Sequence, residues 1–91
     1  MTAGRKLPPS RAELGRLRWR CRRGLRELDV LLERYVDEQF CAASAADQEA
    51  FRQLLDTHDT VIYDYCLGRE APPERLAGVI ERLTAGSSAA R

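Results

Sequence analysis

Residues 16–29, RLRWRCRRGLRELD, hold the densest group of side chains with chemical potential in this chain. Six of these fourteen residues are arginine, and Trp19 and Cys21 lie among them. Arginines beside an aromatic ring can neutralise phosphates and contact bases in a nucleic acid. The same arginines could instead lower the pKa of Cys21 and favour a reactive thiolate. A third alternative is a surface that holds one partner protein.

The first two alternatives meet objections in the spacing of the residues. The arginines point around much of a helix instead of forming one stripe, and no recognised reading helix accompanies them. We therefore favour a solvated basic helix that meets the acidic remainder of the chain. Cys21 shares an apolar stripe with Leu14 and Leu17, so we expect a buried, unreactive thiol. We expect the same of Cys41 and Cys66.

Metal or acid–base chemistry has little support elsewhere in the sequence. His58 lies between Asp56 and Asp59, but acids before a helix usually serve as caps and one histidine is not a site. The three cysteines contain no C-x-x-C pair, so a zinc site would lack ligands. No paired nucleophile and base and no glycine-rich phosphate loop are evident. We expect neither a metal site nor an enzyme.

The positive and negative charges are divided between the two parts of the chain. The net charge of the 91 residues is +1. Residues 1–26 hold nine basic side chains against one acid, whereas residues 27–91 hold six arginines against thirteen acids. Such asymmetry indicates an acidic partner for the first part, or an internal match between the two parts.

Helical periodicity and capping signals indicate five short helices. We expect them at about residues 11–22, 25–40, 45–56 and 60–67, with the last starting at Pro72–Pro73. Ser10 and Ser44 are the predicted N-caps, and Gly24 and Gly68 the predicted helix ends. The predicted fold is all-α: a compact five-helix bundle in a single small domain, residues 11–85, with a flexible arm at 1–10 and a disordered tail at 86–91.

One hydrophobic core and a monomeric state are expected, since the inward positions of four amphipathic segments can all be buried only against one another. The predicted core residues are Leu28, Leu32, Phe51, Leu54, Ile62, Val79 and Ile80.

The segment Arg23-Gly24-Leu25-Arg26-Glu27 joins the first two predicted helices. Arginine favours a helix C-terminus, glycine accepts a positive φ, and glutamate favours a helix N-terminus. On these grounds alone the segment is a well-formed turn without a function.

The wider run WRCRRGLRELDVLL resembles the signature of the FAD assembly factor family, SdhE in bacteria, also called the succinate dehydrogenase assembly factor family. An R-G-x-x-E motif lies inside the longer W-x-C-R-R-G-x-x-E-L-D run. The matching residues are Trp19, Cys21, Arg22, Arg23, Gly24, Glu27, Leu28 and Asp29.

The resemblance continues downstream and covers about residues 16–84. The residues that this chain has at those positions are Leu54, Leu55, Asp56, Asp59, Tyr63, Tyr65, Cys66 and Pro72. The chain departs from the family at Tyr65, where tryptophan is usual, and at Val61, where an acid is frequent.

The resemblance implies an assembly factor or chaperone that is not itself an enzyme. It would bind the flavoprotein subunit of succinate dehydrogenase, or of fumarate reductase, and promote covalent attachment of FAD to a histidine of that subunit. FAD would be the cofactor of the partner, and the chain shows no dinucleotide fingerprint of its own. The resemblance assigns the motif to Arg23, Gly24 and Glu27. The further partner-binding residues predicted are Arg22, Asp29 and Asp59.

Two other functions remain open at this point. One is a regulatory interaction protein of antitoxin type, and the other is a basic nucleic-acid-binding module. The abundance of arginine over lysine and the frequent alanine suggest a GC-rich bacterial genome. We therefore expect the bacterial cytoplasm in preference to the mitochondrial matrix, and no association with a membrane.

Overall fold

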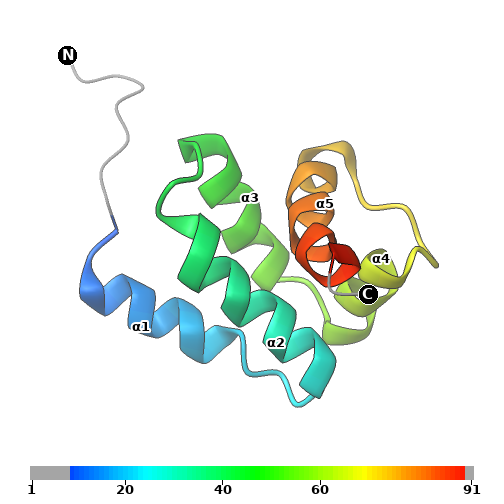
Figure 1. The fold of residues 1–91 in the computed structure, drawn as a ribbon, viewed down its shortest axis with the longest axis horizontal. Coiled ribbons are helices and arrows are strands. Elements are labelled where there is room, and N and C mark those ends of the chain that lie inside the picture. The colour runs from blue at the N-terminus through cyan, green and yellow to red at the C-terminus, as the bar shows by residue number, and fades with distance from the viewer. Residues whose placement is uncertain (1–8, 90–91) are drawn as a thin grey trace.

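The structure, a computed structural model, describes residues 9–89, and all of its regular elements are helical (Figure 1). The elements are α1 (Arg11–Arg20), α2 (Arg26–Tyr35), the π-helical turn η1 (Val36–Phe40), α3 (Ala45–Leu55), α4 (Asp59–Leu67) and α5 (Glu74–Ala89). No strand occurs within residues 9–89, and the predicted all-α fold with five α-helices is confirmed.

Serine caps start two of the helices where the sequence predicts them. The hydroxyl of Ser10 accepts a hydrogen bond of 3.0 Å from the backbone N–H of Glu13. The hydroxyl of Ser44 accepts one of 3.1 Å from the backbone N–H of Asp47. Each bond satisfies an N–H group that has no partner inside its helix, which stabilises the start of α1 and of α3.

The second helical segment reaches Phe40 as predicted, but its last turn is a π-helix. α2 and η1 form one rod between α1 and α5 (Figure 1). The wider turn leaves both Val36 and Phe40 buried. The Phe40 carbonyl accepts a hydrogen bond of 2.7 Å from the buried side-chain amide of Gln48. The same carbonyl accepts a backbone hydrogen bond of 3.2 Å from the N–H of Ala43, so the end of the helix is satisfied from two sides.

All seven predicted core residues are buried, and three aromatic rings complete the core. The rings of Tyr35 and Phe51 are stacked with centroids 4.6 Å apart, and Phe40 lies 5.7 Å from Phe51. α5 covers this core through contacts with α2, α3 and α4. Because the rings come from α2, η1 and α3, burying them fixes these elements against one another.

The structure differs from the sequence-based expectations in three places. Cys41 is exposed, so its predicted burial is wrong: the chain leaves η1 at Phe40 and turns outward. α5 begins at Glu74, after the two prolines. It continues to Ala89, beyond the predicted end at residue 85, because residues 86–89 contain no proline to interrupt it. Residues 1–8 of the predicted arm and 90–91 of the predicted tail lie outside the described residues.

Among residues 9–89, no helix has the length and apolar character needed to cross a membrane.

Replacing Leu54 by alanine tests the predicted core. Leu54 has 0% exposed surface, so we expect the substitution to lower the free energy of unfolding by about 2–5 kcal/mol. Denaturant unfolding followed by far-ultraviolet circular dichroism measures this change. Leu67→Ala is the matched control, since Leu67 is 47% exposed and should lose less than about 1 kcal/mol. Equal losses in the two variants would contradict the assignment of the core.

Candidate partner-binding site

The turn between α1 and α2 depends on Gly24 and on the carboxylate of Asp29. Gly24 has φ 91°, a conformation that residues with a side chain rarely adopt. One oxygen of Asp29 accepts a hydrogen bond of 2.9 Å from the N–H of Arg23, and the other accepts one of 3.3 Å from the N–H of Gly24. Apart from Gly24 and its two chain neighbours, no heavy atom lies within 4 Å of the position that a Cβ on Gly24 would take. Asp29 therefore holds the inner side of the turn, and its outer side is open.

The side chain of Arg23 points into the protein and joins this turn to the loop between α3 and α4. Its Nε donates to Asp59 at 2.6 Å, and its two Nη atoms donate to the carbonyls of Leu55 and Thr57 at 2.9 and 3.0 Å. The side chain is only 15% exposed. A planar guanidinium suits this arrangement because its donors diverge in fixed directions.

The structure brings three of the predicted partner-binding residues together in one internal network. Arg23 contacts Asp59 through its side chain and Asp29 through its backbone N–H. The hydrogen bonds of Arg23, Asp29 and Asp59 are made to other residues of this chain. These three residues therefore determine the shape of the surface that a partner would contact.

Glu27 differs from these residues because its carboxylate is exposed. It lies in the first turn of α2, and its Oε1 accepts a hydrogen bond of 2.5 Å from the hydroxyl of Tyr63. Arg23 and Glu27 are four residues apart, and so are their partners on α4, Asp59 and Tyr63. The two ends of the R-G-x-x-E motif therefore rest on consecutive turns of one helix.

Arginines 18, 20, 22 and 23 each pair with an acid from a later element. The pairs are Arg18–Asp37, Arg20–Asp56, Arg22–Glu33 and Arg23–Asp59. The charge asymmetry of the sequence is thus matched in part inside the protein. These pairs leave less positive charge available for phosphates, which weakens the case for nucleic-acid binding. Arg22 remains 68% exposed, with its Nε 3.7 Å from Glu33 Oε2.

A shallow hollow of about 660 Å³ lies beside the turn. Its lining residues are Trp19, Arg20, Arg22, Arg23, Leu55, Asp56 and Asp59. The ring of Trp19 is 72% exposed, as its place off the apolar stripe of α1 predicts. The hollow adds an aromatic surface to the candidate site, next to the exposed Arg22.

The thiol of Cys21 is buried and unsuited to nucleophilic chemistry. Burial raises the pKa of Cys21 to about 12, with a further rise from the carboxylates of Glu33 and Asp29, while Arg23 and Arg20 oppose it. The predicted burial of Cys21 is confirmed, since none of its surface is exposed, and a thiol with a raised pKa favours the protonated form at neutral pH.

His58 caps the start of α4. It is the N-cap of α4, and its Nδ1 accepts a hydrogen bond of 3.4 Å from the N–H of Thr60. Within the described part of the chain, no group of three or more histidine, cysteine or acidic side chains could hold a metal ion.

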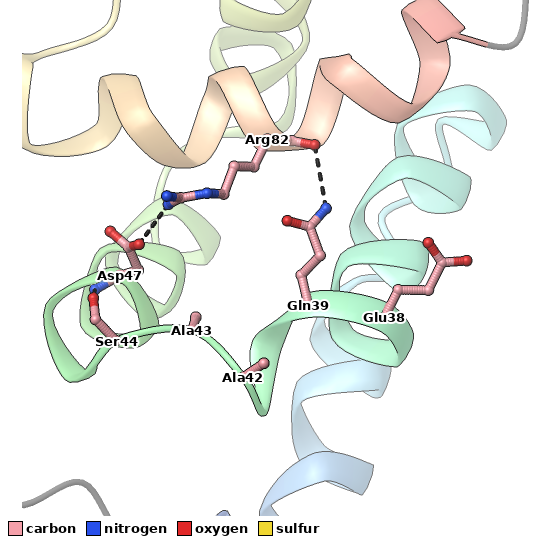
Figure 2. Close-up of a pocket in the computed structure, with 7 residues that line it drawn as sticks. All are labelled: Glu38, Gln39, Ala42, Ala43, Ser44, Asp47 and Arg82. Carbon is pink, nitrogen blue, oxygen red and sulfur yellow. Dashed lines mark hydrogen bonds and ion pairs between the residues drawn. The ribbon is translucent and has the colours of Figure 1, made fainter.

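A second hollow, of about 340 Å³, lies between η1, the start of α3 and α5 (Figure 2). Arg82 of α5 reaches Asp47 of α3, and the side-chain amide of Gln39 donates to the Arg82 carbonyl at 3.4 Å. These contacts tie the three elements together. Apart from the capping residue Ser44, the sequence pattern does not indicate this hollow, because its residues become neighbours only through the packing of α5.

The turn and its surroundings lie in the part of the chain that matches a known protein family. A family profile described as the flavinator of succinate dehydrogenase matches residues 15–86. This segment includes the whole R-G-x-x-E network, from Arg23 to Tyr63.

Curated bacterial relatives carry the name FAD assembly factor SdhE. The Coxiella burnetii protein is 47% identical over 57 residues, which cover 63% of this chain and 70% of the relative. The Xylella fastidiosa (strain 9a5c) protein is 44% identical over 59 residues, covering 65% of this chain and 61% of the relative. The Legionella pneumophila (strain Paris) protein is 34% identical over 68 residues, covering 75% and 86%. No solved structure gives a significant match.

Arg23→Ala should destabilise the protein, because it removes three side-chain hydrogen bonds and leaves Asp59 without its counter-ion. We expect a loss of about 2–4 kcal/mol in the free energy of unfolding. Arg20→Ala is the matched control: Arg20 and Asp56 are 41% and 72% exposed, so their pair should contribute at most about 1 kcal/mol. Denaturant unfolding of both variants checks the difference. Equal stability of the two variants would argue against an internal role for Arg23.

Alkylation of the native protein should distinguish the cysteines. Cys41 is exposed and should react first, whereas buried Cys21 should react only after denaturant is added. Mass spectrometry of timed iodoacetamide reactions, followed by peptide mapping, gives the rate at each thiol. Fast native labelling of Cys21 would overturn its structural assignment.

Proposed function

Because the chain belongs to the succinate dehydrogenase flavinator family, we propose that it is an assembly factor that acts on a flavoprotein subunit. The factor binds that subunit of succinate dehydrogenase and promotes covalent attachment of FAD to one of its histidines. FAD is then the cofactor of the partner and is not retained by this chain. Fumarate reductase is a second possible client, since it is the other flavoprotein that the family resemblance implies.

The proposed mode of action is positioning and not catalysis by the side chains of this protein. Attachment of FAD requires a histidine nitrogen and the flavin to meet in a defined geometry. Holding two reacting groups in place can lower a barrier by several kcal/mol without any further chemistry. A rigid docking surface on a small helical protein suits this task, because it can stabilise one conformation of its client.

The observation that supports this site best is the exposed Glu27 beside a turn that internal contacts hold rigid. Gly24 leaves the outer side of the turn open for the backbone of a partner. Arg22 offers an exposed positive charge next to it. Arg23, Asp29 and Asp59 give the surface its shape. The partner therefore contacts Arg22, Gly24 and Glu27 directly, while Arg23, Asp29 and Asp59 hold the turn in place beneath them.

The proposed setting is the bacterial cytoplasm, where a monomer of this protein meets its client before the enzyme complex is assembled. The bacterial origin of the relatives supports this setting. The paired arginines favour a protein partner over nucleic acid.

Glu27→Ala should separate folding from function. The carboxylate is exposed, so its removal should cost at most about 1 kcal/mol and keep the melting temperature within roughly 4–8 °C of wild type. In a strain that lacks the native factor, the variant should nevertheless lose most covalent flavin on the partner subunit. In-gel flavin fluorescence measures the attachment, and circular dichroism measures the melting temperature.

Glu81→Ala is the matched control, since Glu81 is another exposed glutamate on a helix and lies outside the motif. It should support normal flavin attachment. Full attachment with a well-folded Glu27→Ala would show that the R-G-x-x-E segment is only a turn.

A further inference from the structure

The hydrogen bond between Tyr63 and Glu27 engages only one oxygen of the carboxylate. The hydroxyl of Tyr63 donates to Oε1, and Oε2 has no hydrogen-bond partner within residues 9–89. Glu27 is exposed, so this second oxygen is open to solvent. An ionised carboxylate accepts several hydrogen bonds, and one anchored oxygen leaves the other available to a donor from outside.

An exposed glutamate without such an anchor samples many rotamers. A partner that binds it must then fix the side chain, which lowers affinity through lost conformational entropy. A hydrogen bond that already holds the carboxylate in one place removes part of that cost. The bond from Tyr63 thus prepares Glu27 for binding.

Tyr63 is well supported for this role. Its ring is half-buried against the hydrophobic core. One turn earlier on α4, Asp59 is bound to Arg23, which holds the start of the helix in place. The hydroxyl also remains a donor at neutral pH. The hydrogen bond to Glu27, together with partial burial and the negative charge of Glu27, raises the pKa of Tyr63, while Arg69 opposes the rise.

We propose that Tyr63 is a positioning residue that holds Glu27 in its binding orientation, and that Oε2 of Glu27 accepts a hydrogen bond from a cationic or N–H donor of the flavoprotein partner. This inference rests on the proposed function and extends it, because it adds a residue of α4 to the docking surface and specifies the chemistry of the partner's group.

A double-mutant cycle tests the coupling between the two residues. Affinity for the purified flavoprotein subunit, loaded with non-covalent FAD, is measured for wild type, Tyr63→Phe, Glu27→Ala and the double variant. Tyr63→Phe removes the hydroxyl and keeps the ring. We expect it to weaken binding by about threefold to tenfold in the wild-type background. In the Glu27→Ala background it should have no effect, since the group that it positions is gone.

Tyr65→Phe is the matched control. Tyr65 is a half-buried tyrosine of the same helix that also packs on the core, and within residues 9–89 its hydroxyl has no hydrogen-bond partner. This variant should bind like wild type. Melting temperatures of all variants show whether any loss of affinity reflects unfolding.

A spectroscopic measurement reports the hydrogen bond independently of binding. Tyrosine titration by NMR should show the Tyr63 pKa falling in Glu27→Ala, because the hydrogen bond and the negative charge that raise it are removed. An unchanged Tyr63 titration would overturn the inference.

The outcomes separate this inference from the proposed function. If Tyr63→Phe binds with wild-type affinity while Glu27→Ala binds weakly, the role of Tyr63 is overturned. The proposed docking through Glu27 would still hold. An equal effect of Tyr63→Phe with and without Glu27 would also overturn positioning. Wild-type affinity of Glu27→Ala would overturn the proposed docking surface itself.

Discussion

The guanidinium group of Arg23 is the contact on which the geometry of the candidate site depends. It binds one carboxylate and two backbone carbonyls, which come from the end of α3, the loop that follows it and the start of α4. Its own backbone N–H is held by Asp29. The turn that carries Gly24 is therefore tied to the body of the protein from both sides. An open and exposed surface on a small domain keeps a defined shape because this one side chain is turned inward.

Ionic contacts also explain how so basic a segment belongs to a nearly neutral protein. Arginines of α1 and the following turn pair with acids of α2, η1 and α4 and with Asp56, which follows α3. Exposed pairs of this kind contribute little energy individually. They neutralise part of the positive charge of the segment within the protein.

Local features of the fold were predictable, whereas long-range ones were not. Ser10 and Ser44 are recognisable as caps because capping depends on residues three positions apart. The role of Gly24 follows from its position between two helical patterns. The inward direction of Arg23 does not, because its acceptors lie 32 to 36 residues away. The sequence resemblance identified the motif but could not indicate which members face the interior. The π-turn η1, and with it the exposed Cys41, depends equally on tertiary packing.

The distance along the chain between the motif and its supports has a consequence for protein synthesis. The R-G-x-x-E segment leaves the ribosome well before Asp59 and Tyr63. During that interval Arg23 and Glu27 lack the side chains of α4 to which they bind in the folded protein. Contacts of such sequence separation form late, since a long loop must close before they are made. In an incomplete chain, or in one whose α4 has unfolded, the motif is therefore present but does not adopt the conformation that it has in the folded protein. The proposed docking surface is thus complete only once α4 has packed against the turn between α1 and α2.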